Sequence, residues 1–297
     1  MIKHDNFGAK ALDFTPNKHK RKPFIGSHVL LFIILLFVLV PFYILTITSL
    51  ESEIEANNAA FSWWPKMGLT LDAYKSVLFK KMGGTSVVKG LWNTIWIYVP
   101  GLVVGLLMSA MSAFSFAKLR FRGKNFMFSV LLATMMIPGE LFTITNYQTI
   151  FMLGWQNTYT VLIVPFLVSV FYIYLLRQNF LQIPNELYLA AKVDGTSDFK
   201  YLWKVMVPLS LPTLISITIL KMMGAWNSYV WPRLVANDDA HKLITNGLRN
   251  AFNSSTGETN YPVQMAAVAM VSFPLFLVFI FLRKYIMSGV SRSGIKG

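Results

Sequence analysis

The sequence contains no cysteine, which excludes disulfide bridges and thiolate metal sites. Charge is also scarce, because Asp, Glu, Lys and Arg together make up 13% of the chain, against about 25% in an ordinary soluble domain. Hydrophobic residues reach 55%, and the mean hydropathy is +0.51. A soluble core could not bury this much apolar surface, so we expect lipid to be the solvent for much of the chain.

Two kinds of chemistry lack the residues that they need. No Gly-x-x-x-x-Gly-Lys-Ser/Thr run occurs, so we expect no ATP site of the P-loop type and no enzymatic activity in this chain. Four histidines are present without metal-ligand spacing, and we expect no metal site; they are His4, His19, His28 and His241.

What the sequence does contain is long apolar stretches. A hydrocarbon core of about 30 Å needs about 20 apolar residues in a helix. Six stretches qualify: 29–50, 91–118, 126–150, 159–180, 211–231 and 262–285. The third is interrupted at Pro138-Gly139, where we expect a kink. The predicted fold class is an all-α membrane protein with six transmembrane helices.

The distribution of basic residues predicts the orientation. With the N-terminus inside, the inner segments hold 18 of the 27 lysines and arginines and the outer segments hold eight. The positive-inside rule then places both termini and residues 183–212 in the cytoplasm. Nearly all of the net charge of +14 is therefore cytoplasmic. This is the charge pattern of a membrane topology, and we expect no nucleic-acid partner.

The chain accordingly divides into five parts. Residues 1–28 form a basic cytoplasmic arm, 29–50 the first transmembrane helix and 51–86 an extracellular segment. Residues 87–286 form the main transmembrane domain with five helices and the loop 183–212, and 287–297 form a cytoplasmic tail.

Two features inside the spans call for neighbours. Small residues recur every fourth position along one edge of the second span, so another backbone can approach closely, either within the bundle or from a partner subunit; they are Gly101, Gly105, Ser109, Ala113 and Ala117. Two ionisable residues also lie in the spans. We assign Glu140 to a translocation path and expect Lys221 to snorkel toward the inner interface.

The loop 183–212 has the pattern of two short helices. Pro184 suits a first helical turn, and Gly195 suits a left-handed C-terminal residue. Thr196 or Ser197 can cap a second helix. Its expected apolar stripe is Phe199, Leu202, Trp203 and Met206. Because the first helix carries Ala190 and Ala191 where a membrane-surface helix prefers larger side chains, docking to a protein is favoured over lying on the inner leaflet.

This loop resembles the cytoplasmic loop of permease subunits in ATP-binding-cassette (ABC) importers. That family's pattern is Glu-Ala-Ala, three residues, Gly, nine residues, then Ile-x-Leu-Pro. The matching positions here are Ala190, Ala191, Gly195, Val205, Val207 and Pro208, with Asp194 giving the Asp-Gly form common in sugar importers. The motif glutamate falls on Leu189, and Glu186 lies one turn earlier as a possible substitute.

Two further matches narrow the resemblance. Residues 225–232, AWNSYVWP, resemble the Trp-Asn…Trp-Pro stretch in the fifth helix of carbohydrate permeases. Residues 289–297, GVSRSGIKG, are similar to the tail of the second permease subunit of maltose-type importers. The resemblance covers about residues 29–297.

The resemblance implies a binding-protein-dependent type I importer in the cytoplasmic membrane of a prokaryote, carrying a carbohydrate. The implied partners are a homologous second permease, two cytoplasmic ATPase subunits that hold ATP and Mg²⁺, and an extracellular solute-binding protein. The loop 183–212 would couple to the ATPases. The tail residues Gly294, Ile295, Lys296 and Gly297 would reach between them.

Sugars bind aromatic faces and amides, which gives candidates for the translocation path. Besides Glu140, these are Asn146, Tyr147, Gln148, Trp226, Asn227, Tyr229 and Trp231. Aromatic side chains also gather at membrane interfaces for other reasons. The remaining alternatives are a type I permease for a non-sugar solute and an ion-coupled secondary transporter.

Overall fold

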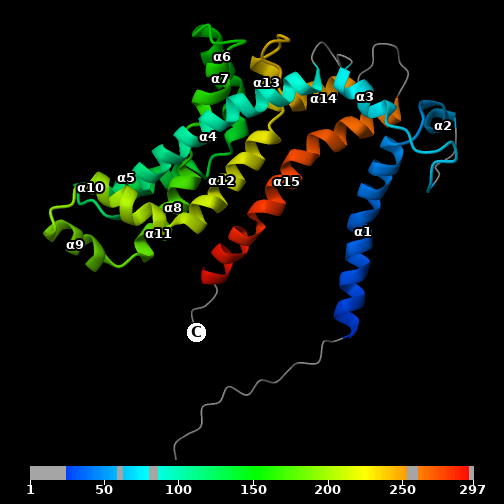
Figure 1. Ribbon diagram of the computed structural model, residues 1–297. Coiled ribbons are helices and arrows are strands. Elements are labelled where there is room, and N and C mark those ends of the chain that lie inside the picture. The colour runs from blue at the N-terminus through cyan, green and yellow to red at the C-terminus, as the bar shows by residue number, and fades with distance from the viewer. Residues whose placement is uncertain (1–24, 59–62, 80–85, 253–259, 294–297) are drawn as a thin grey trace, which may run out of the picture. The chain divides into compact units, whose positions relative to one another are not determined.

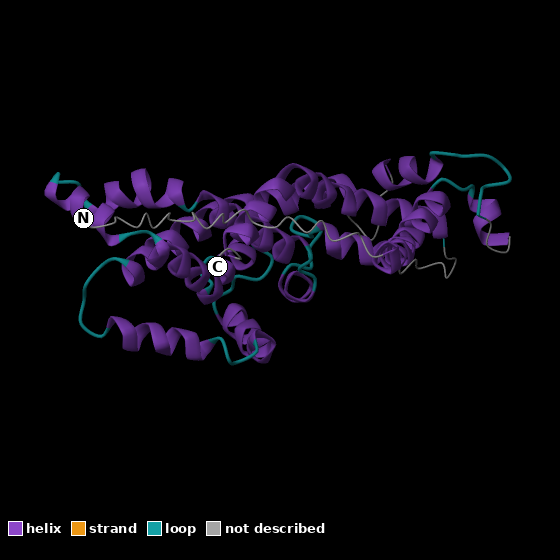
Figure 2. Cartoon of the chain, turned by 90° about the horizontal axis from the view of Figure 1, so that it is seen from below, coloured by secondary structure: helices purple, strands orange, loops and turns teal. Residues whose placement is uncertain are grey.

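A computed structural model describes residues 25–58, 63–79, 86–252 and 260–293 (Figure 1). Every regular element in these ranges is a helix, and none is a strand (Figure 2). The chain divides into two compact units, residues 1–44 and 45–297. The expected tail contact at residues 294–297 lies outside the described residues.

The first unit holds most of a single hydrophobic helix, α1 (Ile25–Ser49). Its apolar stretch, Gly26–Ser49, is 24 residues long. At 1.5 Å per residue this gives about 36 Å, enough to cross a hydrocarbon core of about 30 Å. The helix begins four residues before the predicted span and ends one residue earlier.

The second unit contains two more unbroken helices of spanning length, α4 (Val87–Ala117) and α15 (Tyr261–Ser293). Each tolerates an internal proline, Pro100 in α4 and Pro274 in α15. The predicted span 262–285 thus begins one residue inside α15, which continues well past the predicted end.

Three further spans are bent pairs of helices. The first joins α5 (Lys124–Thr134) to η1 (Gly139–Phe142) and α6 (Thr143–Met152) at 81°. The second joins α7 (Tyr159–Ile163) and η2 (Val164–Phe166) to α8 (Val170–Gln182) at 42°. The third joins α10 (Asp198–Tyr201), η3 (Leu202–Met206) and α11 (Val207–Leu209) to α12 (Leu211–Trp226) at 81°. The described residues therefore contain three unbroken spans, or up to six if each bent pair counts as one.

The break in the third span falls at Pro138, as predicted, but the fifth span ends earlier than predicted. Helix α12 stops at Trp226, and a separate helix, α13 (Val230–Val235), follows. Pro232 has no N–H to pair with the carbonyl of Ser228, so a continuous helix would leave that carbonyl unsatisfied. Thr245 Oγ1 donates to it instead, at 2.7 Å.

The remaining helices lie at the two ends of this bundle. Helix α9 (Asn185–Val193) lies with α10 and α11 at one end of α4 and α12 (Figure 1). Helices α3 (Asp72–Phe79), α13 and α14 (Ile244–Phe252) lie at the other end, and α2 (Glu53–Asn58) completes the set. The loop 183–212 and the predicted extracellular segments are thus at opposite ends of α4.

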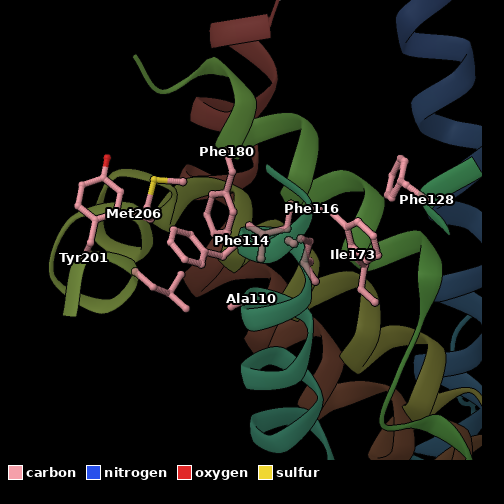
Figure 3. Close-up of a cluster of buried hydrophobic side chains, with 12 residues drawn as sticks. Ala110, Phe114, Phe116, Phe128, Ile173, Phe180, Tyr201 and Met206 are labelled. Atoms are coloured by element: carbon pink, nitrogen blue, oxygen red, sulfur yellow. The ribbon is translucent and has the colours of Figure 1, made fainter. Parts of the chain in front are cut away.

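A cluster of buried apolar side chains joins the loop to the bundle (Figure 3). Phe114 of α4 and Phe180 of α8 lie in the same cluster as Tyr201 of α10 and Met206 of η3. Each of these side chains is at most 4% exposed. Burying an aromatic or methionine side chain contributes roughly 1.5–3 kcal/mol, so this packing anchors the second loop helix to the bundle.

The small-residue edge of α4 packs inside the bundle. Gly105, Ser109 and Ala113 are all buried. A Cβ added at Gly105 would lie 2.6 Å from the carbonyl oxygen of Leu167. Of the two alternatives open at the sequence level, the described contacts support close packing within the chain.

Candidate functional site

The turn between α9 and α10 is built on a left-handed glycine. Gly195 has φ +71°, and nothing lies within 4 Å of a Cβ placed there, so backbone conformation alone demands glycine. Thr196 N donates to Ala191 O at 2.8 Å and Gly195 N donates to Lys192 O at 3.1 Å. These two bonds form a Schellman motif, which confirms the predicted end of the first loop helix.

The second loop helix is capped by Ser197, one of the two predicted residues. Its Oγ accepts from Lys200 N at 3.3 Å. Asp198 in the first turn then links the two helices, because its Oδ1 lies 2.6 Å from Tyr188 Oη and 2.7 Å from Lys192 Nζ. The hydrogen bond that Lys192 donates to Asp198 raises the pKa of Lys192. Burial raises the pKa of Tyr188, and the Asp198 carboxylate raises it further.

Basic side chains from the neighbouring helices fix the loop from the membrane side. Lys118, at the end of α4, donates to Ile183 O at 2.7 Å and to Asn185 Oδ1 at 2.8 Å. Arg177 Nε of α8 donates to Phe116 O at 3.0 Å. These cations satisfy carbonyls at a helix C-terminus, where positive charge is favoured. The start of α9 is therefore tied to the end of α4.

The outer face of this loop carries apolar side chains that the chain leaves exposed. Val193 is 89% exposed, Phe199 62% and Leu189 58%. Leu187 and Ala190 on α9 are exposed as well. Single exposed apolar residues are ordinary, but a group of them around one rigid turn is typical of a protein-contact surface.

The predicted stripe of the second loop helix is correct in part. Leu202 and Met206 are buried, but Phe199 points to the exposed face and the additional buried residue is Tyr201. Residues Leu202–Met206 form a π-helix, whose wider turn changes which positions share a face. A pattern read at 3.6 residues per turn therefore misplaces Phe199.

The other predicted coupling residues lie on the same loop. Glu186 is exposed in the first turn of α9. Leu189 follows one turn later, so both side chains lie near the same helix face. Asp194 is the C-terminal cap of α9, and Pro208 lies in α11; both are exposed.

A second feature is a cavity of about 410 Å³ beside α12. Its walls come from α4, from the break between η2 and α8, and from the second half of α12. Tyr98, Phe166, Tyr172 and Trp226 contribute aromatic rings. Volumes of about 300–1,000 Å³ are typical of sites for small molecules.

Lys221 of α12 lines this cavity, and the expectation that it snorkels to the interface is wrong. Its Nζ donates to Leu167 O at 3.2 Å and lies 6.0 Å from the centre of the Tyr172 ring. Leu167 lies between η2 and α8, so the helix break supplies a carbonyl acceptor inside the bundle. The Leu167 carbonyl therefore holds the Lys221 ammonium beside the cavity.

Of the predicted path residues, Trp226 lines the cavity, and its Nε1 donates to Val271 O at 3.2 Å. Trp231 is buried elsewhere and donates to Val161 O at 3.1 Å. Asn227 bonds to Met223 O of its own helix, and Tyr229 Oη lies 2.6 Å from Arg233. Four others lie in η1 and α6, outside the cavity lining: Glu140, Asn146, Tyr147 and Gln148. In the sequence, the feature that pointed to this cavity was Lys221, a single charged residue within an apolar run.

Comparison with known proteins places this architecture among transport proteins. The sequence profile of the family described as "Binding-protein-dependent transport system inner membrane component" matches residues 86–292. The arabinooligosaccharides transport system permease protein AraQ of Halalkalibacterium halodurans is 32% identical over 205 residues, covering 69% of this chain and 73% of that protein. The sn-glycerol-3-phosphate transport system permease protein UgpE of Brucella suis biovar 1 is 28% identical, covering 89% and 94%.

Solved structures agree in fold. A chain of a bacterial ABC transporter involved in the import of the acidic polysaccharide alginate aligns with a TM-score of 0.80 and 26% identity, over 88% of this chain and 95% of that chain. A chain from the alginate transporter in complex with its alginate pentasaccharide-bound periplasmic protein aligns with a TM-score of 0.59 at 13% identity, over 86% and 91%. The second likeness bears on fold alone.

Proposed function

The chain belongs to the family of binding-protein-dependent transport system inner membrane components, and from that premise we propose how it works as a carbohydrate permease of an ABC importer. The two relatives described above belong to transport systems for arabinooligosaccharides and sn-glycerol-3-phosphate, and the structural neighbour belongs to an alginate importer. The observation that carries the mechanism is the rigid loop at residues 183–212, with its exposed apolar face.

In this proposal the loop docks in a cytoplasmic ATPase subunit. The contact face consists of Glu186, Leu189, Ala190, Ala191, Asp194, Gly195 and Pro208. The small Ala190 permits close approach, and the exposed Val193 and Leu189 offer apolar area. The positive-inside distribution supports a cytoplasmic location for this end of the bundle.

The anchoring of the loop suggests how force is transmitted. ATP binding closes two ATPase subunits and moves the docked α9. Because Lys118 ties α9 to α4, and the buried Tyr201 and Met206 tie η3 and α10 to the core, the loop and the spans move as one body. Closure of the ATPases thereby turns the bundle from inward-open to outward-open.

The proposed assembly needs several partners. A homologous second permease completes the pathway, and two ATPase subunits hold ATP and Mg²⁺. An extracellular solute-binding protein delivers the carbohydrate, which is supported by the family's description as binding-protein-dependent. Residues 294–297 are proposed to contact the ATPases.

The test replaces one left-handed glycine at each end of the molecule. Gly195→Asp places a charge and an unfavourable φ of +71° in the docking turn. Gly154→Asp imposes the same kind of strain at φ +66°, also with open space around it, at the opposite end. In the reconstituted complex, Gly195→Asp is expected to abolish ATP-driven uptake with normal membrane insertion, and Gly154→Asp to retain most of it. Equal activities in the two variants contradict the docking role, and uptake that persists with hydrolysis-dead ATPases contradicts the ABC mechanism.

A further inference from the structure

Lys221 places a positive charge in an otherwise uncharged cavity. Among the described residues that line it, Lys221 is the one with a formal charge. An ammonium group at membrane depth is costly and is normally balanced by an anion or by several hydrogen bonds. The side chain is nevertheless held there by specific surroundings.

Those surroundings leave the ammonium only partly satisfied. It has three N–H donors, and the bond to Leu167 O uses one of them. No carboxylate in the described part of the chain forms an ion pair with Lys221. The ring of Tyr172 adds a weak attraction at 6.0 Å. Room for an anion therefore remains.

The space around the ammonium depends on Gly105 of α4. A Cβ at this position would collide with Lys221 Nζ as well as with Leu167 O. The absence of a side chain at residue 105, together with the helix break at Leu167, therefore lets the charge reach the cavity. Two separate elements of the bundle are adapted to the same ammonium.

The rest of the lining matches a carbohydrate. Tyr98 and Tyr172 contribute aromatic rings, on which sugar rings stack. Ser169 and Ser228 contribute hydroxyl groups, which can both donate and accept hydrogen bonds. A cation beside aromatic faces and hydroxyls is suited to a sugar that bears a carboxylate.

We propose that this cavity binds the carboxylate of an acidic carbohydrate, a uronate unit, with Lys221 as its counter-ion. The proposal rests on the proposed function, since it names the substrate class of the same permease. Lys221 then serves as a specificity residue: it favours acidic over neutral glycans of equal length.

The experiment measures direct binding to the assembled complex, in nanodiscs of zwitterionic lipid and without the solute-binding protein. The probes are a galacturonic acid trisaccharide and its carboxyl-reduced, neutral counterpart. Wild type is expected to bind the acidic probe at least about tenfold more tightly, as for one charge-assisted hydrogen bond. Lys221→Met should remove that preference and leave neutral binding within about twofold. Lys221→Arg should keep the preference.

Lys75→Met is the matched control, because Lys75 is an exposed lysine on α3 paired with Asp72. It should leave both affinities unchanged. Wild type without preference for the acidic probe overturns the proposal, and this measurement requires no variant to fold. An equal loss of affinity for both probes in Lys221→Met also overturns the proposal, because it would show that Lys221 has a structural role only. Neither result affects the Gly195→Asp test, which reads ATP coupling with any substrate.

Discussion

The hydroxyl of Tyr188 on α9 donates a hydrogen bond of 2.6 Å to Oδ1 of Asp198 on α10, across the turn at Gly195. The ring of Tyr188 also packs against Tyr201, with ring centroids 5.1 Å apart. One side chain thus joins the exposed helix α9 to the buried core. The angle between the two loop helices is set by this contact as well as by the glycine.

The first prediction concerns that hydrogen bond. Asp198→Ala removes the acceptor, and Tyr188→Phe removes the donor while keeping the packed ring. A double-mutant cycle should give a coupling of about 0.5–1 kcal/mol, because Asp198 is partly exposed. The measurement is thermal unfolding of the purified complex, combined with ATP hydrolysis stimulated by the binding protein, which should fall in both single variants. Strictly additive effects would show that the bond does not stabilise the loop.

The second prediction is a pH dependence of the loop. The pKa of Tyr188 is raised from 10.0 and that of Lys192 from 10.5. Both groups bind their proton more tightly in the folded loop, so their stabilisation is fully present below pH 10 and is lost as the pH rises through the raised values. The protection factors of amides in residues 185–201, which correct for the intrinsic base catalysis of exchange, should therefore be constant near neutral pH and fall in alkali, where exchange accelerates beyond its intrinsic rise. In Asp198→Asn the acceleration should begin at lower pH, and an unshifted onset argues against this link.

The third prediction concerns the departure from the family pattern at Leu189. Its side chain is 58% exposed, so Leu189→Glu should change stability by less than about 0.5 kcal/mol. If the ATPase presents an apolar surface to this position, docking would bury the new glutamate. Stimulated ATP hydrolysis should then fall about tenfold. Leu69→Glu is the control, because Leu69 lies outside the loop and is 51% exposed. Undiminished hydrolysis in Leu189→Glu means that the ATPase cleft is polar there.

The fourth prediction compares two glycines on one edge of α4. Gly105→Ala brings a Cβ within 2.6 Å of Leu167 O, which is backbone and cannot rotate away, so a loss of about 1–3 kcal/mol is expected. Gly101→Ala meets only Ile163 Cγ2 at 3.4 Å and should be neutral or stabilising by about 0.5–1 kcal/mol. Melting temperatures of the purified complex separate the two. Equal shifts would place the close packing elsewhere on α4.

The sequence predicted local structure well wherever residue chemistry decides it. Gly195 ends α9 because its φ is positive, and Ser197 caps α10 because its hydroxyl reaches Lys200 N. Pro138 breaks the third span since it lacks an N–H. These outcomes depend on neighbours within a few residues, which a single sequence displays directly.

Tertiary contacts decided the features that sequence patterns misplaced. Lys221 remains at cavity depth because Leu167, 54 positions earlier in the chain, offers a carbonyl oxygen. Phe199 leaves the buried stripe because a π-helix follows it. The early end of α12 depends on Thr245, which satisfies Ser228 O from another helix. No periodicity within one span reveals acceptors that other spans supply.

The shortness of α12 has a consequence for its surroundings in the bilayer. Its 16 residues reach about 24 Å, less than the roughly 30 Å of the hydrocarbon core. Lipid cannot satisfy the backbone at either end, so protein must cover the bend at Ser210 and the break after Trp226. A helix shorter than the hydrocarbon core is accommodated by local thinning of the bilayer or by association with other helices. Helix α12 therefore depends on its neighbours for a polar environment at both of its ends, which an unbroken span does not.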